Sequence, residues 1–298
     1  MKHLRNYTYL SICLAFFICL TGCKSETKSI SENLRFCEAI LNYNNYILCA
    51  NFGDKHGDTY NQEGKGYITI YNGKDNSVLI PADGNLSAPK GMAIKNNYLF
   101  IADVQKVVIY DLEHLSLPPR TIKMPAKEIL VTDVAVMGDV LFIAVVNTGN
   151  IYILDITDPN NIDESTLAVY VNIPGANVMC TTNEYKLYIG SSPLANKLPI
   201  EDNVLYVIDD IMQPMPKKLI HDIGAYTGIV VSPAKQTLYF IDVKHNIIGG
   251  LSLKNGKIKK MPMKKHIDHQ NKICLFNREL YVTDFENQTV LTFDLDTY

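Results

Sequence analysis

Acidic and histidine side chains gather at two places where they could bind a cation. The segment GDKHGDTYNQEGKG, residues 53–66, carries Asp54, His56, Asp58 and Glu63. Such ligands suit a divalent cation, although polar loops often carry these residues without one. His266 and His269 are three residues apart, a spacing that places two side chains on one face only in a helix. Because HIDHQN is typical of a turn, we favour a solvated loop there.

Standard catalytic motifs are missing from the sequence. It contains no G-x-S-x-G, H-E-x-x-H, C-x-x-C or P-loop pattern, so hydrolysis by a standard nucleophile has no support. We therefore favour a protein that is not an enzyme, and leave the question of catalysis open.

The N-terminal residues predict export. Lys2 and Arg5 precede the apolar run YLSICLAFFICL, which is too short for a comfortable membrane span and ends in small residues, as in a secretory signal. The tetrapeptide LTGC, ending at Cys23, resembles the bacterial lipobox. This resemblance implies that residues 1–22 are a signal peptide and that Cys23 carries acyl chains such as palmitate. The alternative is an uncleaved anchor helix.

Residues 23–28 then form the lipidated cysteine and its polar tether, and residues 29–298 form one domain. Lys24 does not match the Asp associated with retention in the inner membrane. We expect a bacterial cell-envelope protein, anchored in the outer membrane on its periplasmic or surface face.

The charge of the chain argues against nucleic acid as a partner. The net charge is −3, and loss of residues 1–22 leaves 26 basic against 31 acidic side chains, or −5. A nucleic-acid binder needs a basic stripe, whereas the basic clusters here are short turn segments.

Four cysteines remain after export and lipidation, and none has the spacing of a metal site. Export permits a disulfide, but a sequence cannot select the partners. We favour buried free thiols. The four are Cys37, Cys49, Cys180 and Cys274.

A pair of apolar strands recurs six times and predicts the fold. The first member reads YILCANF, LFIADV, LFIAVV, LYIGSS, LYFIDV and LYVTDF, and the second reads YITIYN, KVVIYD, NIYILD, VLYVID, IIGGLS and TVLTFD. A unit of about 40 to 50 residues with four short strands is typical of a β-propeller blade. We predict an all-β, six-bladed propeller of four-stranded antiparallel blades. Its sixth blade lacks an outer strand, which residues 29–36 would supply.

The same alignment predicts a ring of polar residues around one mouth of the central channel. In a propeller the inner strand of every blade begins at the same face. Counting back from the aligned strands, the ring consists of Glu38, Lys90, Thr132, Asn177, Thr227 and Asn271. The long loops 53–66 and 191–203 belong to opposite blades and would face each other across this mouth.

Individual blades resemble known repeats. The third, TDVAVMGDVLFIAVVNTGNIYILDITDPNN, resembles the LVIVD repeat of exported surface proteins. The second and fifth, APKGMAIKNNYLFIADVQKVVIYDL and TGIVVSPAKQTLYFIDVKHNIIGGLSL, are more similar to NHL repeats and to the gluconolactonase-like members of the TolB-like propeller superfamily. In NHL repeats an Asp that ends the second strand binds turn backbone, which implies this role for Asp103, Asp242 and Asp284.

The gluconolactonase-like resemblance implies a metal alternative. In that family a Glu of the first blade and Asn or Asp residues of later blades hold one divalent cation such as calcium. Glu38, Asn177 and Asn271 match these positions, whereas Thr227 replaces part of the family motif and the usual Asp is not clearly present. The other interpretation is that the ring residues only bind water.

Two functions of different classes remain. The leading hypothesis is a lipid-anchored exported scaffold, monomeric and without a cofactor, that binds a protein or a small molecule at the channel mouth. The alternative is a metal-dependent hydrolase of the gluconolactonase-like class.

Overall fold

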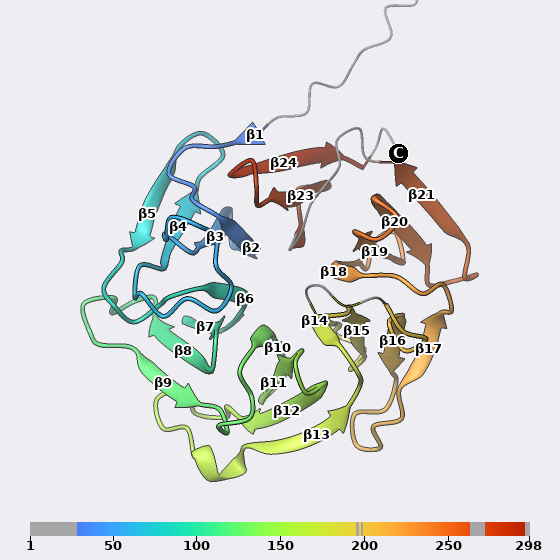
Figure 1. Cartoon of the computed structure of the whole chain (residues 1–298), viewed down its shortest axis with the longest axis horizontal. Coiled ribbons are helices and arrows are strands. Elements are labelled where there is room, and N and C mark those ends of the chain that lie inside the picture. The colour runs from blue at the N-terminus through green and yellow to red at the C-terminus, as the bar shows by residue number, and fades with distance from the viewer. Residues whose placement is uncertain (1–28, 195–196, 198, 263–271, 296–298) are drawn as a thin grey trace, which may run out of the picture.

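Six sheets surround a central axis in the computed structural model, which describes residues 29–194, 197, 199–262 and 272–295 (Figure 1). Each sheet has four antiparallel strands, and its innermost strand lies next to the axis. The predicted all-β, six-bladed propeller is therefore confirmed. Cys23, His266, His269 and Asn271 lie outside the described residues.

The strands of the first three blades follow one another along the chain. Blade one contains β2 (Cys37–Tyr43), β3 (Tyr46–Asn51), β4 (Tyr67–Tyr71) and β5 (Asn76–Ile80). Blade two contains β6 (Pro89–Lys95), β7 (Tyr98–Asp103), β8 (Lys106–Asp111) and β9 (Arg120–Lys123). Blade three contains β10 (Val131–Met137), β11 (Val140–Val145), β12 (Asn150–Asp155) and β13 (Ala168–Asn172), with a short 3₁₀ helix at Glu164–Thr166.

The remaining blades keep this order until the last strand. Blade four contains β14 (Ala176–Thr181), β15 (Leu187–Ser191), β16 (Leu205–Ile208) and β17 (Lys217–Ile220). Blade five contains β18 (Tyr226–Ser232), β19 (Thr237–Asp242), β20 (Ile247–Ser252) and β21 (Ile258–Pro262). Blade six contains β22 (Ile273–Phe276), β23 (Glu279–Asp284), β24 (Thr289–Asp294) and the N-terminal β1 (Ser29–Ile30).

In blades one to three, tight turns join the first two strands where the sequence offers residues that tolerate a left-handed backbone. Asn44, Asn96 and Gly138 occupy these turns with φ of 54°, 53° and 58°. Asn and Gly adopt this conformation at low cost, and the resulting turns match the twist of a hairpin. The turns therefore fix the register of the strands on either side.

A separate hydrophobic layer fills each of the six gaps between neighbouring sheets. Between blades two and three, for example, Phe100 and Val107 pack with Val134, Leu141 and Ile143. Equivalent clusters lie at the other five interfaces. Every blade is thus buried on both faces, which explains why its strands are rich in Ile, Val and Leu rather than strictly alternating.

The N-terminal strand closes the ring, as the sequence predicted. Ser29 pairs with Leu291 and Ile30 with Val290, so β1 supplies the outer strand of blade six. In Figure 1, β1 lies beside β24 at the edge of the ring. Ile30 and Leu34 are buried in the cluster between blades six and one.

The same cluster contains three of the four cysteines. Cys37, Cys49 and Cys274 are buried there, and Cys180 is half-buried in blade four. All four are free thiols, as favoured from the sequence. Among the described residues, no helix has the length and hydropathy needed to cross a membrane.

We expect the closure to be essential for stability. Deleting residues 24–36 removes the buried side chains of Ile30 and Leu34, each of which stabilises the fold by about 1.5–3 kcal/mol. It also removes the pairing of β1 with β24. The melting temperature should fall by roughly 10 °C or more, measured by circular dichroism. The matched control deletes residues 24–28 and leaves β1 in place, so it should melt like the parent chain. Equal melting of both deletions would contradict the closure.

Candidate ligand site in the central channel

The ring residues occupy equivalent irregularities of the inner strands. In blades one to five, the register between the first two strands shifts at the start of the inner strand, at Glu38, Lys90, Thr132, Asn177 and Thr227. A β-bulge leaves one residue unpaired and redirects its side chain. The sequence alignment therefore located a common structural position in five blades, whereas Asn271 lies outside the described residues. Their role in binding stays a prediction.

Two buried charged residues lie beside the ring. The sequence did not identify them as candidates. Asp133 begins the regularly paired part of β10. Lys272 lies directly before β22, and its backbone O accepts the Thr283 N–H at 3.1 Å. Each follows a ring position by one residue. They belong to blades three and six, which face each other across the axis (Figure 1). The Lys272 Nζ lies 3.6 Å from the Asp133 Oδ2. An ion pair thus spans the centre of the propeller.

Gly91 makes room for this acid. A β-carbon placed on Gly91 would lie 1.7 Å from the Asp133 Oδ1. The Asp133 carboxylate therefore packs directly against the backbone of the neighbouring blade. The sequence signal was the glycine in GMAIKN, at a position that is also glycine in blade five (Gly228), but it does not reveal which side chain uses the space.

Several channel side chains bind the inner strand of another blade. The Met179 backbone N–H donates to the Asp133 Oδ2 at 2.7 Å, and the Lys272 Nζ donates to the Asn177 backbone O at 3.4 Å. The Asn177 Nδ2 donates to the Tyr226 backbone O at 3.2 Å. The inner edge of a blade exposes unpaired backbone groups, and these contacts satisfy some of them. Much of the channel polarity is therefore structural.

Three ring atoms have no such partner among the described residues. The Glu38 Oε2, the Thr132 Oγ1 and the Thr227 Oγ1 are buried without a hydrogen bond. They come from blades one, three and five, and therefore alternate around the channel. Buried polar atoms in native proteins are nearly always satisfied by protein, water or a bound molecule. These atoms are the strongest candidates for ligand contacts.

Burial shifts the acid–base properties of the ring. Glu38 and Lys90 are only 4% and 1% exposed. Burial raises the pKa of Glu38 to about 8, although Lys272 and Lys90 oppose this shift. Burial also lowers the pKa of Lys90 to about 8, against the attraction of Asp103 and Glu38. The pKa of Asp133 is raised by burial, with Lys272 acting in the opposite direction.

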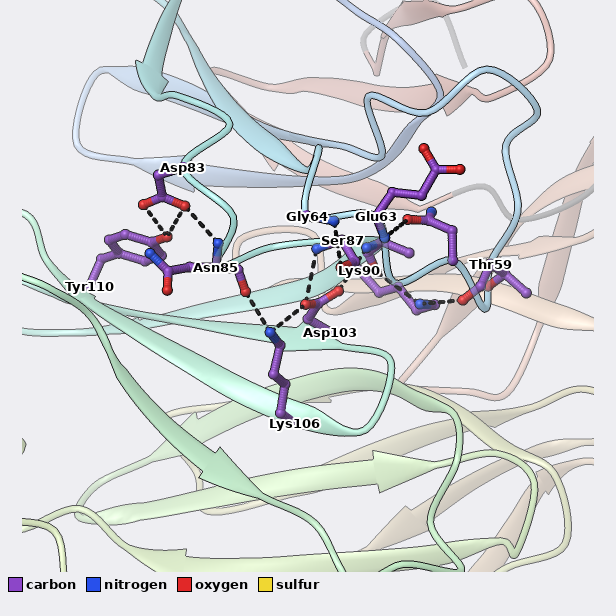
Figure 2. A network of polar contacts seen from close by, with 12 residues as sticks. Thr59, Glu63, Gly64, Asp83, Asn85, Ser87, Lys90, Asp103, Lys106 and Tyr110 are labelled. Atoms are coloured by element: carbon purple, nitrogen blue, oxygen red, sulfur yellow. Dashed lines mark hydrogen bonds and ion pairs between the residues drawn. The ribbon is translucent and has the colours of Figure 1, made fainter.

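The long loop of blade one reaches the channel through Lys90. The Lys90 Nζ donates to the Thr59 backbone O at 3.0 Å and to the Ala88 backbone O at 2.8 Å. It also lies 5.3 Å from the centre of the Phe52 ring. Figure 2 shows Lys90 and Thr59 joined in this way beside the network of blade two. This ammonium therefore fastens the loop to the second blade.

Asp103 organises the rest of that network. Its carboxylate accepts the backbone N–H groups of Ser87 and Ala88 at 3.1 and 2.8 Å, and pairs with the Lys106 Nζ at 3.4 Å (Figure 2). Asp242 and Asp284 likewise accept backbone N–H groups of adjacent turns. These contacts confirm the role that the NHL resemblance implied for the three residues, which is to bind the backbone of turns.

The acidic residues of the blade-one loop form hydrogen bonds and an ion pair within the loop, and are not arranged around a cation. The buried Asp54 carboxylate accepts the backbone N–H groups of His56, Gly57 and Asp58. The Asp58 Oδ1 accepts the Tyr60 N–H, and the Glu63 Oε2 pairs with the Lys65 Nζ. The cation site considered for this loop is therefore not formed. A sequence cannot show this, because the partners are backbone amides.

The charge of the channel disfavours the divalent cation implied by the gluconolactonase-like resemblance. A cation between Glu38 and Asn177 would face the ammonium groups of Lys90 and Lys272, both of which interact electrostatically with Glu38. The described positions, Glu38 and Asn177, therefore lie in surroundings that oppose a cation, and the third matched position, Asn271, lies outside the described residues.

Elsewhere in the described part of the chain, one group could share a metal ion. Asp111, Glu113 and His114 bring their ligand atoms together at an exposed turn of blade two. Exposed acidic groups of this kind are common without an ion, and no second feature points to a ligand there.

The comparisons with known proteins agree with this architecture. The model of the LVIVD repeat matches residues 89–118 and 130–166, which covers the third blade as expected and also most of the second, where NHL similarity was expected. No curated protein matches the chain by sequence. The chain is thus a six-bladed β-propeller that carries LVIVD repeats.

Solved structures show the same fold at low sequence identity. The crystal structure of a nidogen/laminin complex aligns with a TM-score of 0.64 and 14% identity over 79% of this chain and 88% of that chain. A structural genomics protein of unknown function from Bacteroides thetaiotaomicron aligns with a TM-score of 0.61 and 9% identity over 90% and 71%. The extracellular domain of a putative one-component system from B. thetaiotaomicron aligns with a TM-score of 0.56 and 12% identity over 92% and 34%.

The raised pKa of Glu38 predicts how stability depends on pH. The folded state holds a proton on Glu38 between the ordinary pKa of 4.5 and about 8, whereas the unfolded state releases it. The free energy of unfolding should therefore be greatest below pH 4.5 with respect to this group. It should fall as pH rises toward 8, by at most about 1.4 kcal/mol per pH unit.

Glu38→Gln should flatten this dependence, since Gln does not titrate. Urea denaturation between pH 5 and 8 measures the slope. Lys90 affects stability in a higher pH range. Its lowered pKa makes the free energy of unfolding rise with pH from about 8 toward 10.5. An equal slope in both proteins would show that Glu38 does not titrate in this range.

Proposed function

We propose that the protein is a non-catalytic, lipid-anchored propeller that binds a small polar ligand at the channel mouth formed by the ring residues. The observation that carries this proposal is the set of three buried atoms without a partner, on Glu38, Thr132 and Thr227. They lie at equivalent bulges of alternate blades. A ligand between them would be held from three sides.

The chemistry of these groups favours a neutral ligand with hydroxyl groups. A threonine hydroxyl both donates and accepts hydrogen bonds, and a protonated carboxyl does the same. The pKa of Glu38, about 8, keeps this carboxyl largely protonated at neutral pH. Lys90 is occupied by two backbone carbonyl oxygens. The mouth therefore offers neutral hydrogen-bonding groups rather than a free charge.

A non-catalytic role is supported by the lack of an activated nucleophile. Neither Thr132 nor Thr227 has a hydrogen-bonded base among the described residues, and general-base activation requires such contact. The hydrolase alternative depends on a cation polarising the substrate, for which the donor set described above is unsuited.

The ligand class can be tested by thermal shift with glucose and myo-inositol as probes. We expect one of these probes to raise the melting temperature of the chain, and Thr132→Val to remove the shift, because valine keeps the shape and loses the hydroxyl. Thr121→Val, on the exposed outer strand of blade two, is the matched control and should respond like the parent.

Two results would contradict the proposal. An identical response of Thr132→Val and Thr121→Val, or no response to either probe, would show that the mouth does not bind such ligands. Stabilisation by Ca²⁺ alone that disappears in Glu38→Gln would support the metal-dependent alternative instead.

The anchor is a separate prediction. Two or more acyl chains hold a protein stably on a membrane, so Cys23→Ser should move the protein from the membrane fraction to the soluble fraction and abolish incorporation of labelled palmitate. Cys180→Ser controls for loss of a cysteine elsewhere. Membrane association that survives Cys23→Ser would indicate an uncleaved anchor helix.

A further inference from the structure

A second cavity lies on the propeller axis, toward the end opposite the mouth. It has a volume of about 200 Å³, and the inner strands of all six blades contribute to its wall. It extends from Asp133 and Lys272 to Asn42 and Leu275, which lie near the ends of their strands. The ring residues Glu38, Thr132 and Thr227 do not line it, so it is distinct from the site proposed above.

The wall of this cavity is mainly apolar, and its charged groups are concentrated at one end. Met92, Met179 and Ile229 supply large buried side chains from three different blades. Lys272 and Asp133 are the charged residues of the lining. Small-molecule sites commonly have this composition, with apolar walls and a few polar groups that fix the orientation of the ligand.

Of the two charged groups, Lys272 has hydrogen-bonding capacity to spare. The Asp133 carboxylate accepts a short backbone hydrogen bond from Met179 at 2.7 Å and rests on Gly91. The Lys272 ammonium has three N–H donors, and its described partners are more distant, at 3.4 Å from the Asn177 backbone O and 3.6 Å from Asp133. An incoming acceptor can therefore approach Lys272 without displacing a short hydrogen bond.

We propose that this cavity binds a small monocarboxylate whose apolar body packs against Met92, Met179 and Ile229 and whose carboxylate accepts hydrogen bonds from Lys272. Charge-assisted hydrogen bonds between ammonium and carboxylate are among the strongest polar contacts. They gain further strength where water is excluded.

The size of the cavity limits the ligand to a single ring or a short chain. An apolar cavity of about 150 Å³ accommodates benzene, so about 200 Å³ suits a benzene ring with one carboxylate. Long-chain fatty acids and peptides are too large to be enclosed.

Calorimetric titration of the chain from residue 23 onward, carrying Cys23→Ser, tests the proposal with benzoate, benzyl alcohol and benzylamine as probes. We expect benzoate to bind more tightly than either isosteric probe. Lys272→Met should weaken benzoate at least tenfold and leave benzyl alcohol nearly unchanged. Lys217→Met removes an exposed lysine that pairs with Asp209, and should bind benzoate like the parent chain.

Two further variants keep the test decisive if Lys272→Met folds poorly. The double variant Lys272→Met with Asp133→Asn removes the ion pair without leaving a buried lone charge, and should lose benzoate selectivity. Ile229→Trp fills the cavity and leaves the ion pair in place, so it should abolish benzoate binding. Thr132→Val, at the mouth, should leave benzoate affinity unchanged, which separates this site from the proposed function.

The proposal is overturned if benzoate does not bind the parent chain, or if its affinity is the same in Ile229→Trp. It is also overturned if benzylamine binds more tightly than benzoate and loses affinity in Asp133→Asn, because the cavity would then select a cation.

Discussion

The pairing of the two ends of the chain is the constraint on which the rest of the structure depends. Without β1, blade six would have three strands and an open outer edge. Two pairs, Ser29 with Leu291 and Ile30 with Val290, complete it. Since each blade packs against two neighbours, closure at this point fixes the spacing of all six inner strands. The ring of bulges and the cavity exist only in the closed arrangement.

The closed ring leaves unpaired backbone groups at its centre. Six inner strands present their free edges to a narrow channel, and unpaired backbone groups there are costly when water is excluded. Asp133, Asn177 and Lys272 meet this requirement by binding the backbone of other blades. Among the described ring residues, the buried atoms without a partner lie on Glu38, Thr132 and Thr227, and no such backbone contact explains them.

The strands and the ring could be predicted because they repeat. Six copies of the same two strands fix the register, so counting back from LFIADV or LYFIDV reaches the bulge at Lys90 or Thr227. The repeats also predicted that the first residues of the domain would complete the last blade.

Features formed between blades could not be predicted in this way. Asp133 and Lys272 are ordinary strand residues in the sequence, and their ion pair depends on the way blades three and six face each other. Asp54 was considered as a metal ligand since its backbone partners carry no sequence signal. Glu38 matched a family cation position, but the two lysines that surround it come from other blades.

We infer that a mixed-charge core around the Lys272–Asp133 pair organises the channel, rather than a cation beside Glu38. A crystal structure of the chain grown in calcium, with anomalous scattering recorded to locate the ion, tests it most directly. We expect the Lys272 Nζ to lie against Asp133 and no calcium peak beside Glu38. A calcium ion bound by Glu38 and Asn177, with Lys272 turned away from Asp133, would show instead that the channel is a cation site.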